Sequence, residues 1–212
     1  MRSLGLFYGL GLGLSALALL TFAWLSENVL DRDLRAFNTA VSLGVHTQAH
    51  PVFDRLALAL TEWGGLVGAS VVAFVVTAYL IVKRRFGEAT AFWVTLGGGA
   101  ALGWLLKRIF QQPRPDAFEP LVAVGGFSYP SGHSLLSSTL YGYLAALVIL
   151  GGPRQPGRWA AAVGILSIPI AVMWSRIYLG AHWVSDVVAG GLVATVWVCT
   201  CLMLHRRAIS ES

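Results

Sequence analysis

The stretch SYPSGHSLLSSTLYGYLAALVILG, residues 128–151, joins a polar segment directly to an apolar run. Proline is common just before a helix, and serine is a favoured N-cap residue. Pro130 and Ser131 therefore predict that a helix begins here, with Gly132 leaving its backbone N–H open to a ligand. Free amides at a helix start attract anions. The sequence thus places an anion site, with His133 beside it, at one end of an apolar helix.

The rest of the chain is apolar as well, which decides the fold class. Of 212 residues, 56% are hydrophobic and 12% are charged, too few charges to cover a soluble domain of this size. We predict an all-α, polytopic membrane protein with a single domain over residues 1–212. No convincing signal-peptidase site follows the first apolar run, so we expect it to be a retained helix. Six segments approach or reach bilayer-spanning length: 4–25, 64–82, 89–106, 134–151, 159–176 and 183–204.

The basic residues are grouped along the chain in a way that predicts its orientation. With six spans, the two termini and alternate loops share one side, and loops rich in Lys and Arg stay in the cytoplasm. We expect both termini inside, in a bacterial inner membrane if the source is bacterial, and the active site outside. The net charge of +5 then reports topology, and no nucleic-acid partner is expected. The basic groups are Arg2, 83–85, Arg154 with Arg158, and 205–207; the opposite side holds Glu27, Asp31, Asp33, Asp54, Glu62, Asp116, Glu119 and Asp186.

The segment 26–62 is the longest stretch outside the spans. Its first half predicts an amphipathic helix over 28–45 that lies at the outer surface, and a second such segment leads into the next span. Whether 26–62 shapes a substrate gate or only covers the bundle stays open. We expect no catalytic role for His46 or His50. The apolar positions of the first helix are Val29, Leu30, Leu34, Phe37 and Val41.

Cys199 and Cys201 stand two residues apart in the last span. On a helix, side chains at that spacing point in different directions, which disfavours a disulfide. No Cys or His spacing typical of zinc is present. We therefore expect no metal site and no cofactor.

Two external segments, 107–133 and 175–186, contain nearly all of the unusual polar residues. Both lie at span ends on the same predicted side, so a helix bundle brings them together without crossing the membrane. The cations among them match a tetrahedral oxyanion, and together with the free helix amides they predict a phosphate site. The first segment supplies Lys107, Arg108, Arg114, Ser131 and His133, and the second supplies Arg176, His182 and Asp186.

The two histidines suit different roles. His182 and Asp186 are four residues apart, so the carboxylate is expected to hold one imidazole nitrogen protonated and leave the other as a nucleophile. His133 is expected to protonate the leaving oxygen as a general acid. A phosphohistidine on His182 would then be hydrolysed by a water that His133 deprotonates.

These residues resemble the three motifs of the type 2 phosphatidic acid phosphatase superfamily of membrane lipid phosphatases. The resemblance implies a six-helix core and metal-independent dephosphorylation of a membrane lipid phosphate through His182, with His133 as the acid and Asp186 orienting the nucleophile. It assigns phosphate binding to Lys107, Arg114, Ser131, Gly132 and Arg176. The motifs are K-x6-R-P from Lys107 to Pro115, P-S-G-H from Pro130 to His133, and S-R-x5-H-x3-D from Ser175 to Asp186.

Several functions are compatible with these motifs. We rank undecaprenyl diphosphate first as the substrate, with phosphatidylglycerol phosphate and phosphatidic acid as alternatives. A phosphotransferase would use the same intermediate but pass the phosphate to a lipid or sugar hydroxyl. Vanadate-dependent haloperoxidases share the site pattern, but their known members are soluble. A transporter or a lipid-binding protein is the non-catalytic alternative, although charges within the spans, which mark ion paths, are scarce. The expected partners are the lipid phosphate and the bilayer, and the sequence does not set an oligomeric state.

Overall fold

The computed structural model describes residues 2–151 and 155–211, and all regular secondary structure in these ranges is α-helical. This confirms the predicted all-α class. The helices are α1 (Arg2–Leu30), α2 (Arg35–His46), α3 (Pro51–Glu62), α4 (Leu66–Val82), α5 (Phe86–Phe110), α6 (Gly132–Leu150), α7 (Pro156–Tyr178) and α8 (Val184–Glu211).

The described residues contain five helices that are long and apolar enough to cross a membrane: α1, α5, α6, α7 and α8. A sixth crossing is reached if α3 and α4 count as one span, bent by 47° at the break between them. Because α4 alone has 17 residues, the crossing predicted at 64–82 is one arm of this bent pair. The polytopic membrane fold is confirmed.

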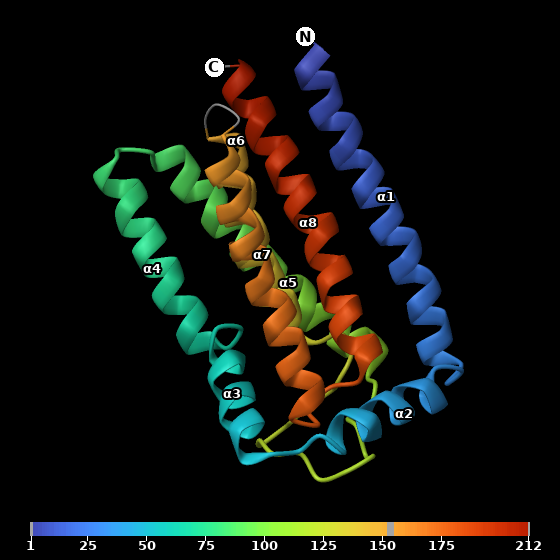
Figure 1. The fold of residues 1–212 in the computed structure, drawn as a ribbon. Coiled ribbons are helices and arrows are strands. Elements are labelled where there is room, and N and C mark those ends of the chain that lie inside the picture. The colour runs from blue at the N-terminus through green and yellow to red at the C-terminus, as the bar shows by residue number, and fades with distance from the viewer. Residues whose placement is uncertain (1, 152–154, 212) are drawn as a thin grey trace.

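The helices α6, α7 and α8 form the centre of the bundle, with α1 packed along α8 and α5 packed against α6 and α8. Figure 1 shows α4 leaning away from the other helices. Phe92, Leu140 and Tyr143 are fully buried between these elements. Large apolar side chains such as Leu20 and Phe74 lie exposed on the outside, as expected for helices whose surroundings are lipid rather than water.

The segment 26–62 folds differently from the prediction. Instead of one helix over 28–45, α1 continues to Leu30, and α2 begins after a turn at Arg35. The face of α2 that is buried carries Asn38 and Ser42, while Phe37 is 55% exposed. The inward face of α2 is thus polar. Asn38 accounts for this arrangement, because its amide exchanges two hydrogen bonds with Ser185 at the start of α8.

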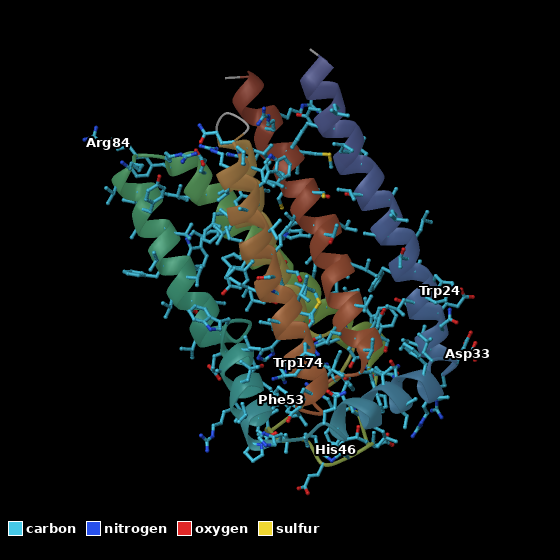
Figure 2. All side chains as sticks on the ribbon, in the orientation of Figure 1. Trp24, Asp33, His46, Phe53, Arg84 and Trp174 are labelled. Atoms are coloured by element: carbon cyan, nitrogen blue, oxygen red, sulfur yellow. The ribbon has the colours of Figure 1, made fainter. Side chains whose placement is uncertain are left out.

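The two ends of the bundle differ in character. One end of the bundle carries α2, α3 and the connections from α5 to α6 and from α7 to α8 (Figure 1). Both ends of the described chain lie at the other end. Figure 2 shows Arg84 at the end where the chain terminates, and Asp33 and His46 at the opposite end. The basic turn between α4 and α5 therefore lies on the side of the termini, as the charge pattern predicts.

Neighbouring glycines in α5 offer a test of the packing of α5 against α8. A Cβ on Gly98 would lie 2.1 Å from Cζ2 of Trp197, whose indole is held in place by donating to the carbonyl of Thr95 at 2.8 Å, whereas a Cβ on Gly97 meets nothing within 4 Å. We expect Gly98→Ala to lower the thermal unfolding temperature in detergent by several degrees. Gly97→Ala, the matched control, should be neutral or slightly stabilising because alanine favours the helix. Equal effects of the two substitutions would contradict this packing.

Candidate active site

The residues predicted from the three motifs gather at the end of the bundle that carries α2 and α3. Lys107 lies in the last turn of α5, and Arg114 lies in the connection that follows it. Ser131, Gly132 and His133 form the start of α6. The remaining three, Arg176, His182 and Asp186, occupy the end of α7, the turn after it and the first turn of α8.

The start of α6 has the local geometry predicted from the sequence. Ser131 is the N-cap residue, and its Oγ accepts a hydrogen bond from the backbone N–H of Ser134 at 3.4 Å. Its own backbone N–H donates to the carbonyl of Asp186 at 2.9 Å. A Cβ placed on Gly132 would lie 3.8 Å from Cε of Lys107. The free amides of the first helical turn therefore lie beside a lysine, which adds a full positive charge to the anion site.

The pair of His182 and Asp186 is in contact, but it does not share a helical turn. His182 lies in the turn before α8, and its Nδ1 is 3.1 Å from Oδ2 of Asp186. The same oxygen accepts the backbone N–H of Trp183 at 2.9 Å. The predicted contact is present because the carboxylate caps the start of α8, not because both residues are helical.

The tautomer of His182 follows from its two neighbours. Nη1 of Arg114 lies 3.1 Å from Nε2 of His182. A guanidinium has only donors, so Nε2 accepts, and the ring proton is assigned to Nδ1, from which it points to Asp186. The imidazole therefore presents a lone pair on Nε2 next to a fixed positive charge.

Backbone carbonyls hold the cations in place. Nζ of Lys107 donates to the carbonyls of Phe127 and Ser128 at 2.6 and 3.1 Å. Arg114 donates to the carbonyls of Gly125 and Gly126 in the same loop, at 2.7 and 3.3 Å, and to Ala181 at 2.8 Å. Positive charge is thus concentrated around Nε2 of His182.

His133 faces the same cluster from the start of α6. Its side chain is half-buried, and a Cβ on Gly65, at the break between α3 and α4, would lie 3.5 Å from its Nε2. The charged or titratable groups that act on it electrostatically are Arg176, His182, Arg114 and Lys107. The structure therefore brings all eight predicted residues into one cluster.

Burial sets the protonation of His182 at neutral pH. His182 is 3% exposed, and burial lowers its pKa to about 4, although the carboxylate of Asp186 acts in the opposite direction. Burial also lowers the pKa of Arg114. A histidine with a lowered pKa is uncharged over the physiological range, so Nε2 carries no proton and its lone pair can accept from Arg114.

Two residues in contact with the site were not predicted from the sequence. Ser128 donates its hydroxyl to Oδ2 of Asp186, and its Oγ lies 3.3 Å from Nδ1 of His182. Ser128 stands two residues before Pro130, so its position beside the P-S-G-H motif is the one sequence feature that could have indicated a role in the site. Thr61, at the end of α3, accepts a hydrogen bond from Arg176 at 2.8 Å. Nothing in its local sequence indicates that contact.

His46 and His50 make contacts outside this cluster. The His46 ring stacks on Phe118, with centroids 4.1 Å apart. Nδ1 of His50 accepts the backbone N–H of Val52 and so caps α3. In the described part of the chain, no three His, Cys, Asp or Glu side chains are grouped as metal ligands would be.

Residues 88–210, more than half of the chain, match the family model described as the PAP2 superfamily. The chain belongs to the PAP2 superfamily. Among its relatives is phosphatidylglycerophosphatase B of Bacillus subtilis, 24% identical over 174 residues, which are 81% of this chain and 84% of that protein. An undecaprenyl-diphosphatase of Sulfolobus acidocaldarius is 32% identical over 131 residues, 58% of each chain. A human dolichyldiphosphatase 1 is 30% identical over 139 residues, again 58% of each chain.

Two solved structures share the fold of this PAP2 protein. The crystal structure of a transmembrane PAP2-type phosphatidylglycerolphosphate phosphatase from Bacillus subtilis has a TM-score of 0.82 at 22% identity, and covers 93% of this chain and 96% of the other. The structure of LpxE from Aquifex aeolicus has a TM-score of 0.60 at 20% identity, and covers 77% and 93%. These likenesses confirm the helical membrane fold.

The protonation of His182 can be measured directly. We expect its ring to stay neutral, with the proton on Nδ1, as the pH falls through the ordinary imidazole value of about 6.5, and to become charged only near pH 4. A lowered pKa means that the neutral form persists to lower pH. ¹⁵N NMR of histidine-labelled protein in detergent reports both charge and tautomer, and His182→Gln identifies the signal. A charged ring at pH 6, or a proton on Nε2 at neutral pH, would contradict the geometry.

Proposed function

We propose that this PAP2 protein is a lipid phosphatase that acts through a covalent phosphohistidine on His182. The observation that carries the proposal is the contact between Nε2 of His182 and Nη1 of Arg114, with Nδ1 on Asp186. In this arrangement the lone pair of Nε2 lies next to a guanidinium that can bind an anion, and the carboxylate accepts a hydrogen bond from Nδ1. That arrangement is what attack on a phosphate requires.

In the first step, the lone pair on Nε2 of His182 attacks phosphorus, a P–N bond forms, and the bond from phosphorus to the leaving oxygen breaks. His133 gives its proton to that oxygen, so the lipid leaves as an alcohol or as a lipid monophosphate. Asp186 stabilises the positive charge that develops on the imidazole. The oxygens of the transferring phosphoryl group are held by Lys107, Arg114 and Arg176, by the hydroxyl of Ser131 and by the free amide of Gly132.

In the second step, a water attacks phosphorus on the phosphohistidine. His133, now neutral, takes a proton from this water, and the P–N bond breaks. Inorganic phosphate is released, the electron pair returns to Nε2 of His182, and His133 is protonated again. The sequence of steps is balanced without a cofactor.

The proposed substrate is a lipid phosphate or diphosphate, with undecaprenyl diphosphate ranked first. The support is that one relative is named an undecaprenyl-diphosphatase. Another relative, which matches a larger share of this chain, is named phosphatidylglycerophosphatase B, so phosphatidylglycerol phosphate is the alternative. The basic groups near the chain termini favour an active site on the external face of a bacterial inner membrane. Hydrolysis of lipid presented only to the outer face of intact cells tests this orientation.

The function is tested by phosphate release from a panel of lipid phosphates in detergent, with a chelator present throughout. We expect release without any added acceptor alcohol, and a loss of at least about a thousandfold in His182→Ala, because the nucleophile is gone. His205→Ala is the matched control, since His205 lies towards the opposite end of α8 and should leave the rate unchanged.

Other outcomes of the panel have distinct meanings. Release that requires an acceptor alcohol would replace the hydrolase with a phosphotransferase. Release that is lost with chelator and restored by a divalent cation would contradict metal-independent chemistry. Full activity in His182→Ala would contradict the assigned nucleophile.

A further inference from the structure

Arg176, one of the proposed phosphate-binding residues, has an unusual environment. Its side chain is 6% exposed, and Nη1 donates to Oγ1 of Thr61 at 2.8 Å. Thr61 is equally buried, at 6% exposed. Among the described residues, no hydrogen-bond partner exists for Nε of Arg176. A buried guanidinium with so few partners has its direction set by the one side chain that holds it.

The helix that carries Thr61 is firmly attached to the helix that carries Arg176. The helix α3 lies along the end of α7 (Figure 1), and Phe53 and Trp174 mark this region in Figure 2. Asp54 accepts the hydroxyl of Tyr178 at 2.6 Å. Ala57 is completely buried against Tyr178 and Leu179. The position of Thr61 relative to Arg176 is therefore defined by packing on both sides of the hydrogen bond.

The break that follows Thr61 also faces the site. A Cβ on Gly64 would lie 2.4 Å from Cγ1 of Val172 in α7, so only a glycine allows this close approach. Gly65 lies close to the ring of His133. The hydroxyl of Tyr141 in α6 donates to the carbonyl of Trp63 at 3.1 Å. The break between α3 and α4 thus contacts both helices that supply the general acid and Arg176.

We propose that Thr61 is a positioning residue for Arg176, and that the bent pair of α3 and α4 is in this way a wall of the phosphate site. The inference rests on the proposed function. Thr61 lies outside residues 88–210, which match the family model, and outside the three motifs. Its hydroxyl oxygen fixes one nitrogen of the guanidinium, so the remaining donors are already directed when a phosphoryl group binds. This assigns a role to the segment before the first motif.

The experiment compares Thr61→Val, which keeps the shape and removes the hydroxyl, with Thr61→Ser, which keeps the hydroxyl. We expect kcat/KM for the best lipid phosphate to fall by about tenfold to a hundredfold in Thr61→Val, and to stay near wild type in Thr61→Ser. Thr195→Val is the matched control, because that hydroxyl bonds only to the carbonyl of Gly191 in its own helix. Thermal unfolding confirms that each variant is folded.

A double-mutant cycle separates positioning from a general effect on packing. If Thr61 acts through Arg176, then Thr61→Val should cause little further loss in an Arg176→Gln background. Full additivity of the two losses would overturn the proposal, as would a Thr61→Ser variant as impaired as Thr61→Val. A Thr61→Val variant within twofold of wild type would overturn it too.

Binding of orthovanadate, a phosphate analogue, tests the role of Thr61 without requiring that the protein hydrolyse a lipid. We expect orthovanadate to raise the unfolding temperature of the wild type and of Thr61→Ser, and to do so less in Thr61→Val at the same concentration. If the wild type binds orthovanadate in this way but releases no phosphate from any lipid, the proposed function fails while the role of Thr61 stands. Equal protection of the wild type and Thr61→Val would overturn the role of Thr61 whatever the substrate.

Discussion

Asp186 is a fully buried carboxylate, and its need for hydrogen-bond donors holds three parts of the chain against one another. Its Oδ2 receives the ring N–H of His182, the backbone N–H of Trp183 and the hydroxyl of Ser128. Its backbone carbonyl receives the N–H of Ser131, the cap of α6. A buried charge without donors is very costly. The turn before α8, the loop before α6 and the start of α6 are therefore locked in one arrangement.

The cations of the site depend on this arrangement. Because Ser128 is fixed on Asp186, its carbonyl and that of Phe127 are placed where Lys107 binds them. Arg114 connects the loop before α6 with the turn before α8. It donates to a glycine carbonyl in the loop, and to Ala181 and His182 in the turn. Mutual repulsion among buried cations is a cost that an incoming phosphate relieves. The structure thus couples the protonation of His182, the position of the cations and the affinity for an anion.

Much of the fold and the site could be predicted from the sequence, because both depend on features that are local in the chain. Apolar length predicts the helices, and the motif residues predict the cluster. Contacts between distant residues outside the three motifs were not predictable. Thr61 and Arg176 are 115 residues apart, and no periodicity reveals that pairing. The inward polar face of α2 was also missed, because in lipid an apolar side chain such as Phe37 gains little by turning inward. The kink between α3 and α4 made one predicted span into part of a bent pair.

The most direct test of the central claim is to trap phosphate on His182. An aryl phosphate such as p-nitrophenyl phosphate has a leaving group that needs no proton, so His133→Ala should still form the intermediate but fail to activate water. We predict that mass spectrometry after a rapid alkaline quench finds phosphate, stable to alkali and labile to acid, on the peptide that contains His182. The phosphate should be absent from the variant that also carries His182→Ala. Phosphate on another residue, or release of p-nitrophenol at the full rate with no phosphorylated peptide, would contradict a phosphohistidine at this position.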